Sequence, residues 1–333
     1  MGRTLVILAA GMGSRFGGPK QLEALGPNGE VIVDFSIYDA CRSGFDSVVL
    51  IIRRAMWDSF ERSVCARWRP HISVELCFQE LDDLPASLAP PMGRSRPWGT
   101  AHALLSAERA IDGPFAVINA DDFYGVAAFE MLSGFLREAG SSGAAASTAD
   151  HVSPTMDDES LTTDHVSRFT DHGSRVTDHA VVGFPLRGTL GDGEPVNRAL
   201  LRISPAGWLD DIEEITGIEA VGQHGRYHTS VGTERTINGD ALISMNMWGF
   251  RESVFTSLKA AFHDFIAKHG DEPQSEFLLP AFVASMIHEK RARVKVLRGG
   301  GEWCGVTHPG DRPRVARFLR TIVERGDYPV ALW

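Results

Sequence analysis

Three absences narrow the kinds of protein that this chain of 333 residues can be. No apolar run approaches the roughly 20 residues that a membrane-spanning helix needs. The four cysteines are scattered without a C-x-x-C pair, which indicates reduced thiols and no disulfide framework. Basic residues are not in excess, because 33 Lys and Arg face 43 Asp and Glu, and the net charge is −10. We therefore expect a cytoplasmic protein that binds neither nucleic acid nor an anionic membrane.

What the chain does contain is a glycine-rich stretch directly after an apolar run near its beginning. Thr4 to Leu8 is typical of a buried parallel strand, and it runs into A-A-G-M-G-S-R-F-G-G-P-K. Gly11 and Gly13 remove side chains where the backbone must turn, so that bare N–H groups can face a phosphate. Arg15 and Lys20 add full positive charges close by. Together these features predict a binding site for a triphosphate.

Two other kinds of glycine loop fit these residues less well. No G-x-x-x-x-G-K-[ST] string follows a strand, so the chain has no P-loop. A dinucleotide fingerprint, G-x-G-x-x-G, would have Phe16 at its third glycine position. The next predicted strand ends in Arg53 and Arg54, where an acidic residue would hold the ribose of NAD. These arginines leave an NADP-dependent oxidoreductase as an alternative.

Strand and helix patterns alternate over the first 140 residues. This alternation predicts an α/β fold with a mixed, mostly parallel sheet and helices on both faces. Ligands of such sheets bind beyond the carboxyl ends of the strands. Gly11, Gln79 and Asp121 each follow a strand at that end, so we expect them to converge. The predicted strands are 47–52, 72–78 and 115–119, and the predicted helices are 33–43, 56–68 and 100–110.

Beyond this region the chain divides into a polar segment and a second structured part. Residues 141–180 are rich in Ser, Thr and Asp and repeat a Thr-Asp-His unit. We expect a polar, mobile insertion there in preference to a metal site, which would need tighter pairing of its ligands. The elements predicted after it are a hairpin (199–204 and 208–212), a strand at 240–250, helices at 254–269 and 276–289, a strand at 294–297 and a helix at 312–325.

The glycine loop resembles the signature of the sugar-1-phosphate nucleotidyltransferases, which is L-A-A-G-x-G-x-R followed by P-K. I-N-A-D-D at 118–122 and W-G-T-A-H at 98–102 also resemble motifs of this family. The resemblance covers nearly the whole chain outside 141–180. It implies the Rossmann-like, three-layer α/β/α fold of nucleotide-diphospho-sugar transferases. It also implies transfer of a nucleotidyl group from a nucleoside triphosphate to a sugar-1-phosphate, or to a sugar-like cyclitol phosphate, with release of pyrophosphate.

The same resemblance assigns roles on the nucleotide side of the site. Arg15 would act on the leaving phosphates and Lys20 on the reacting phosphates. Asp121 would hold the catalytic Mg²⁺, for which a carboxylate after a buried strand is a suitable hard ligand. Asp240 and Glu276 are candidates for a second metal carboxylate. The predicted nucleotide-binding residues are Ala9, Ala10, Gly11, Gly13, Gln79, Gly99 and Thr100, with Gln79 and the G-T-A turn holding the base.

On the acceptor side the resemblance is less specific. The string M-N-M-W-G-F, which contains Asn246, is similar to the family's N-x-G strand. Many members have a lysine after a glutamate, where this chain has Ile215, so Arg198 or Arg202 would replace it or the acceptor is unusual. Asp122 is alternatively the N-cap of the next helix. The predicted acceptor-binding residues are Asp122, Arg198, Glu214 and Asn246.

These observations predict one domain, 1–333, with a nucleotide-binding half (1–140) and an acceptor-binding half (181–333). Ile215 also favours a second hypothesis, a non-catalytic nucleotide-sensing or regulatory protein on the same fold. The oxidoreductase alternative explains neither Asp121 nor the P-K pair. The sequence does not identify the base or the acceptor, since these differ by one or two hydrogen-bonding groups. The C-terminal helices are a candidate homodimer surface.

Overall fold

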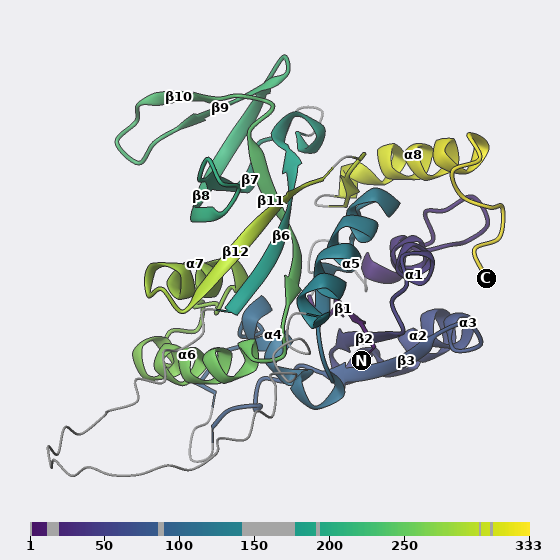
Figure 1. Cartoon of the computed structure of the whole chain (residues 1–333), viewed down its shortest axis with the longest axis horizontal. Helices are drawn as coiled ribbons and strands as arrows, with labels where there is room; N and C mark the ends of the chain where they lie inside the picture. The colour runs from purple at the N-terminus through teal and green to yellow at the C-terminus, as the bar shows by residue number, and fades with distance from the viewer. Residues whose placement is uncertain are drawn as a thin grey trace, which may run out of the picture.

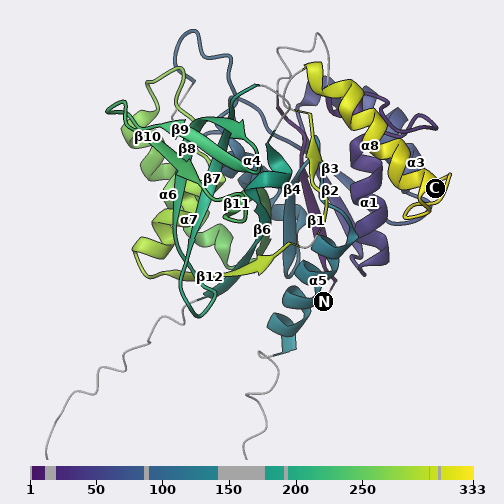
Figure 2. The ribbon, with the colours of Figure 1, turned by 90° about the horizontal axis from the view of Figure 1, so that it is seen from above.

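One mixed sheet forms the centre of the computed structural model, which describes residues 2–11, 20–85, 90–141, 177–190, 194–299, 301–306 and 309–333 (Figure 1). Its strands follow the order β10-β9-β8-β7-β11-β4-β1-β2-β3, and β6 pairs with both β11 and β12 beside this path. Helices cover both faces of the sheet (Figure 2). The predicted α/β fold with a mixed sheet is confirmed.

The N-terminal half of the sheet is parallel. β1 pairs with β2 and β4 in a register that sets Leu8 beside Ile51 and Asn119, so these strands end at one edge. Every residue of β1 is buried, as its unbroken apolar sequence predicts. The elements of this half are β1 Thr4–Leu8, α1 Ile32–Arg42, β2 Ser47–Ile52, β3 Ser73–Phe78, α4 Thr100–Ser106, β4 Phe115–Asn119 and α5 Val126–Ser141.

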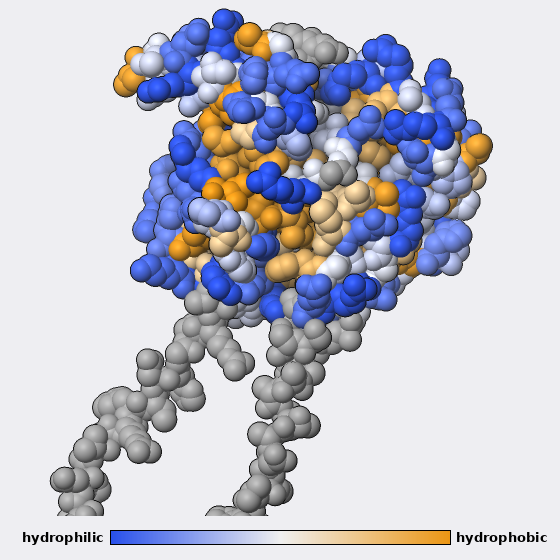
Figure 3. Space-filling model, turned by 45° about the horizontal axis from the view of Figure 1, so that its top comes forward, coloured by the Kyte–Doolittle hydropathy of each residue, from blue (hydrophilic) through white to orange (hydrophobic). Residues whose placement is uncertain are grey.

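The second half of the sheet is mainly antiparallel and joins the first through β11, which pairs antiparallel with β4. The end of β8, with β9 and β10, forms an arm that stands clear of the body (Figures 1 and 3). Val221 and Val231 are exposed on this arm. The strands are β6 Thr177–Pro185, β7 Val196–Ile203, β8 Leu209–Val221, β9 His224–His228, β10 Glu234–Ile237, β11 Leu242–Phe250 and β12 Ala292–Arg298.

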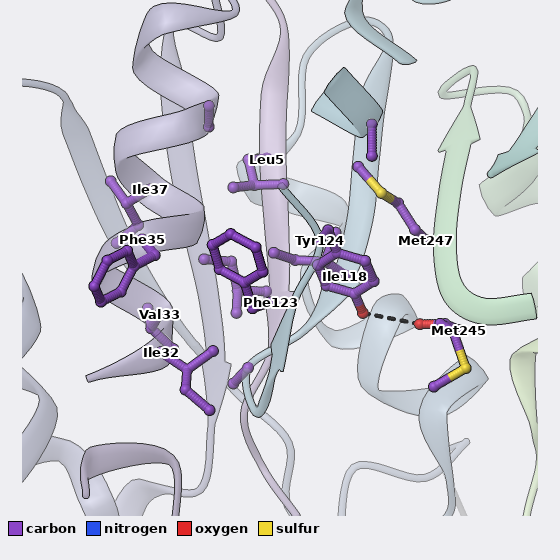
Figure 4. Close-up of a cluster of buried hydrophobic side chains, with 14 of the residues drawn as sticks. Leu5, Ile32, Val33, Phe35, Ile37, Ile118, Phe123, Tyr124, Met245 and Met247 are labelled. Atoms are coloured by element: carbon purple, nitrogen blue, oxygen red, sulfur yellow. Dashed lines mark hydrogen bonds between the residues drawn. The ribbon is translucent and has the colours of Figure 1, made fainter. Parts of the chain in front are cut away.

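Two hydrophobic cores lie on opposite faces of the sheet. α1, α5 and α8 cover one face, and α4, α6 and α7 cover the other (Figure 2). β1 contributes side chains to both cores, because successive residues of a strand point to opposite faces: Leu5 and Ile7 belong to the first core, and Val6 and Leu8 to the second. Figure 4 shows part of the first core, between α1 and β11. The three C-terminal helices are α6 Val254–His269, α7 Leu279–His288 and α8 Arg312–Glu324.

The helix predicted at 56–68 is present but irregular. It divides into a 3-10 turn, a short α segment, a π segment and a last α turn, which are η2 Arg54–Met56, α2 Trp57–Phe60, η3 Glu61–Cys65 and α3 Ala66–Trp68. The π segment shifts the helical register between the two buried anchors Phe60 and Trp68. The remaining short elements are η1 Lys20–Leu22, η4 Glu108–Ala110, β5 Asp122–Phe123, η5 Leu186–Thr189, β13 Cys304–Gly305 and η6 Pro309–Asp311.

The polar segment predicted at 141–180 is shorter than expected at its C-terminal end. β6 begins at Thr177 and pairs in parallel with β12, so the last Thr-Asp-His copy lies in the sheet. Asp178 forms an ion pair with Arg293, and His179 is buried. Pairing with β12 thus overrides the polar composition that predicted an insertion here. The other two copies lie in 142–176, outside the described residues.

Two findings concern membrane-spanning helices and the state of the cysteines. Within the described ranges, no helix combines the length and the apolar character that crossing a bilayer requires. All four cysteines are free thiols. Burial raises the pKa of Cys65, Cys77 and Cys304 to about 11, so these thiols stay protonated and weakly reactive at neutral pH.

Candidate nucleotide-binding site

A pocket of about 440 Å³ lies where β1, β3 and β4 end. Gly11, Gln79 and Asp121 all line it, so the convergence expected from the strand order is confirmed. One segment of the C-terminal half, directly before the helix that begins at Leu279, also reaches it, through Glu276 and Leu278. The lining residues are Leu8, Ala10, Gly11, Gln21, Gln79, Arg96, Pro97, Gly99, Thr100, Ala103, Asn119, Asp121, Glu276 and Leu278.

The glycine loop is described only at its two ends. Ala10 and Gly11 line the pocket, whereas Ala9 packs into the first core and donates its N–H to Ile51. Residues 12–19, with Gly13 and Arg15, lie outside the described residues, and their roles stay predictions. Lys20 begins η1, directly before a residue that lines the pocket.

Gln21 is a pocket residue that the sequence argument missed. It is buried, and its Nε2 donates to the carbonyl of Gly11 at 3.0 Å. Its Oε1 is also buried and has no hydrogen-bond partner among the residues that the structure describes. A buried acceptor without a partner costs free energy, so this oxygen is suited to accept a hydrogen bond from a bound ligand or water. Its place immediately after the P-K pair was the only signal in the sequence.

Gly99 must be glycine because the chain of residue 277 passes against it. Its φ is +106°, and a Cβ atom there would lie 2.5 Å from the carbonyl oxygen of Phe277. Phe277 donates to Trp98 O at 2.6 Å and accepts from Ala101 N at 2.9 Å, which fastens the G-T-A turn to the segment before α7. Thr100 Oγ1 accepts from Leu279 N at 2.9 Å and so satisfies a free N–H at the start of α7.

Gln79 is held by the same turn. Its Nε2 donates to Gly99 O at 2.9 Å and lies 3.1 Å from Nδ1 of His102. Nε2 of His102 is in turn 2.9 Å from Asp83 O. Burial lowers the pKa of His102, so the ring is neutral at neutral pH. His102 was missed as a site residue, although it stands in the W-G-T-A-H string that drew attention to its neighbours.

The two aspartates after β4 differ in position. Asp121 lines the pocket, and its backbone oxygen accepts from Val306 N at 3.1 Å. Asp122 is buried in β5, where Oδ2 accepts from Asn119 Nδ2 at 2.9 Å and lies 3.3 Å from the hydroxyl oxygen of Tyr124. α5 begins only at residue 126, so the alternative of Asp122 as its N-cap is wrong.

Asn246 sits in a bulge of β11 with a φ of +63°, an unusual conformation for a residue other than glycine. Its Nδ2 donates to Asn119 Oδ1 at 2.8 Å, and its Oδ1 accepts from Trp248 Nε1 at 2.7 Å. The hydroxyl of Tyr124 donates to Met245 O at 2.8 Å beside it (Figure 4). The bulge is therefore tied to the end of β4. Asn119, which joins it to the pocket, was not predicted.

The other predicted acceptor residues lie on β7 and β8, and neither is among the described residues that line the pocket. Arg198 is buried and donates to Thr189 Oγ1 at 3.2 Å and to Asn197 O at 2.9 Å; burial lowers its pKa. Glu214 is exposed, although nearby protein raises its pKa through desolvation. Ile215 points to the opposite side of β8 and is buried in the first core. A lysine at 215 would therefore enter the core and not an acceptor site.

The donor set of the pocket suits one kind of metal ion. Across the parts of the chain that the structure describes, no cluster of three or more His, Cys, Asp or Glu could hold a metal. Asp121 and Glu276 line the pocket, and Glu276 lies 3.6 Å from Arg96 in an ion pair. Asp240 is instead paired with Arg187. Mg²⁺ needs only one or two carboxylates and completes its shell with water and phosphate oxygens, so Asp121 fits Mg²⁺ carried by a triphosphate.

Known proteins resemble this chain in sequence pattern and in fold. A family model described as "MobA-like NTP transferase domain" matches residues 5–223, more than half of the chain. The inositol-1-phosphate CTP transferase from T. maritima shares 13% identity with a TM-score of 0.58, over 97% of each chain. A UDP-glucose pyrophosphorylase complexed with UDP-glucose shares 12% identity with a TM-score of 0.55, over 96% of this chain and 98% of that one. At these identities the two likenesses establish the fold. No curated protein sequence matches the chain.

Proposed function

The chain belongs to the MobA-like NTP transferase family, and we propose that it activates a sugar-1-phosphate or a sugar-like cyclitol phosphate as its nucleoside diphosphate derivative. The observation that carries this proposal is the pocket that unites Gly11, Gln79 and Asp121. The names of the two structural neighbours support the acceptor class, because inositol-1-phosphate is a cyclitol phosphate and UDP-glucose is a nucleotide sugar.

The proposed reaction joins an oxygen of the acceptor phosphate to the α-phosphorus of the triphosphate and expels pyrophosphate. Negative charge accumulates on the phosphate oxygens, so the protein must supply position and positive charge. Asp121 would hold Mg²⁺, which when bound offsets part of that charge. Arg15 and Lys20 would supply the remaining charge from the glycine loop. Gln79 and the turn at Gly99 would hold the base at the other end of the pocket.

The first experiment is a measurement of pyrophosphate release. The purified protein is incubated with Mg²⁺, each of the five nucleoside triphosphates, and a panel of sugar-1-phosphates and inositol phosphates. We expect release with one triphosphate and one acceptor, loss of release with EDTA and recovery with added Mg²⁺. Triphosphate binding in a thermal-shift assay without release for any pair would favour the regulatory alternative. If the protein shows neither triphosphate binding nor pyrophosphate release, the triphosphate site itself is overturned.

The regulatory alternative loses its main support in the structure. It was motivated by Ile215 at the position of an expected lysine, but the side chain at 215 belongs to the core and does not report on an acceptor phosphate. Membership of a transferase family does not favour the oxidoreductase alternative. A cytoplasmic location and a homodimer through the C-terminal helices belong to this proposal, and gel filtration with light scattering tests the second.

A further inference from the structure

His102 is a buried histidine behind the pocket, at one end of a short chain of hydrogen bonds. Only 2% of its surface is exposed, and the centroid of its ring lies 4.7 Å from the ring centroid of Phe262. Nδ1 faces the side-chain nitrogen of Gln79, and Nε2 faces the carbonyl of Asp83. It does not line the pocket, but it touches the glutamine that does.

Both ends of this chain are backbone carbonyls, and this fixes the direction of every hydrogen bond between them. A carbonyl can only accept, so Asp83 O requires the single proton of the neutral ring to sit on Nε2. Nδ1 is then an acceptor and takes one N–H of Gln79. Gly99 O, also an acceptor, takes the other N–H. Both amide protons of Gln79 are therefore used inside the protein.

The opposite orientation of the Gln79 carboxamide is unfavourable. It would place Oε1 about where Nε2 now lies, 2.9 Å from Gly99 O, with no proton between two acceptors. It would also require a second proton on the His102 ring, whose pKa burial lowers. Gly99 cannot easily turn its carbonyl away, because the backbone of Phe277 packs against it. From the sequence alone, Gln79 could offer a base either its N–H donor or its carbonyl acceptor. In the structure its N–H groups are used within the protein, so only the acceptor is available to a base.

We propose that His102 is a positioning residue for base specificity: it locks Gln79 so that Oε1, an acceptor, faces the nucleobase. The base must then present an amino or imino N–H at that position. Among the described residues, Oε1 of Gln79 has no hydrogen-bond partner, although the side chain is only 5% exposed and lines the pocket. The inference rests on the proposed function, because it assumes that a nucleotide occupies this pocket.

The direct test removes the N–H from the base without adding bulk. The triphosphate that binds wild-type protein best is compared with an analogue whose Watson–Crick edge has acceptors but no N–H. For a pyrimidine this is pyrimidin-2-one ribonucleoside triphosphate, and for a purine it is purine ribonucleoside triphosphate. We expect the analogue to bind at least about ten-fold more weakly in calorimetry, because Oε1 would be desolvated without a partner. Equal affinities would show that Gln79 does not present an acceptor and would overturn the inference.

A matched pair of variants isolates the role of His102. His102→Asn keeps an acceptor where Nδ1 lies, and His102→Gln keeps a donor where Nε2 lies but loses the acceptor. We expect His102→Asn to retain the ten-fold preference for the parent triphosphate. In His102→Gln the freed carboxamide of Gln79 can rotate, so the preference should fall towards one.

Stability and activity controls separate the possible failures. The melting temperature of both variants is measured, since a purely structural role for His102 would lower stability without changing the ratio of the two affinities. The same ratio in both folded variants would overturn the role of His102. If His102→Gln does not fold, the analogue measurement on wild-type protein still decides how Gln79 is oriented. If no triphosphate binds wild-type protein at all, the proposed function fails together with this inference.

Discussion

Replacing Gly99 by alanine tests whether the base pocket depends on the close passage of residue 277. The new Cβ would lie 2.5 Å from Phe277 O and 2.8 Å from its carbonyl carbon and its nitrogen, all backbone atoms that cannot rotate away. Overpacking of this kind costs about 1–3 kcal/mol. Its φ of +106° and ψ of 177° lie in a region that is essentially restricted to glycine, which adds about 1–3 kcal/mol for a residue with a side chain. We expect Gly99→Ala to lower the free energy of unfolding by about 2–6 kcal/mol.

Gly29→Ala is the matched control. Gly29 has a similar φ of +87°, but an added Cβ would meet nothing within 4 Å. Only the backbone strain of about 1–2 kcal/mol applies there. Urea unfolding of both variants and of wild-type protein measures the difference. Equal losses in the two variants would refute the argument, because the clash with residue 277 would then cost nothing.

The same substitution should also change substrate binding. Relief of the clash moves the turn at Gly99, and its carbonyl accepts one of the two protons of the Gln79 amide. We expect the KM for the triphosphate to rise more than kcat falls, since the base is bound alike in the ground state and the transition state. Pyrophosphate-release kinetics measure both. If Gly99→Ala is destabilised but its KM for the triphosphate is unchanged, the turn at Gly99 does not contribute to binding of the base.

Three further predictions concern single side chains. Asp121→Asn should abolish pyrophosphate release with little change in melting temperature, and full activity would contradict the metal role. Ile215→Lys should cost about 3–5 kcal/mol in urea unfolding by burying an unpaired charge, without improving acceptor binding. Burial raises the pKa of Asp39 to about 6, although Tyr328 and Arg42 lower it, so the folded state favours the protonated acid. Wild-type stability should therefore fall by about 2 kcal/mol relative to Asp39→Asn as the pH rises from about 4 to 6, and parallel urea profiles would contradict this.

Much of the fold could be predicted because its helices and strands have clear local hydrophobic patterns in the sequence. The strand at 115–119 and the helix at 254–269 have the predicted bounds, since an apolar run and a strong 3.6-residue pattern each end at polar residues. The helix predicted from 276 begins instead at 279. Residues 276–278 stay outside the helix because Phe277 forms hydrogen bonds to Trp98 and Ala101, nearly 180 positions earlier in the chain. No local pattern reports such a contact.

The site residues also divide into those that local sequence patterns reveal and those that only long-range contacts reveal. Gly11, Gln79, Gly99 and Asp121 could be found because strand ends of a parallel sheet meet at one edge. Gln21, Asn119 and His102 could not, because only the fold brings each of them to its hydrogen-bond partner, which is Gly11, Asn246 or Gln79 respectively. Their side chains are also common in ordinary helices and strands, so the sequence offered no reason to single them out. The roles of Arg15 and Gly13, and of the acceptor residues, stay predictions.

The way the pocket is closed has a consequence for the order in which the protein assembles during synthesis. Arg94 donates to Ser275 O at 2.7 Å and to Glu272 O at 3.0 Å, across 181 and 178 positions of the chain. Contacts over such separations are late to form, because the loop between them must first be ordered. A nascent chain that ends before residue 272 contains every predicted catalytic residue but lacks one wall of the pocket. Such a truncated chain should not bind nucleotide tightly, so capture of triphosphate would report that synthesis has passed residue 278.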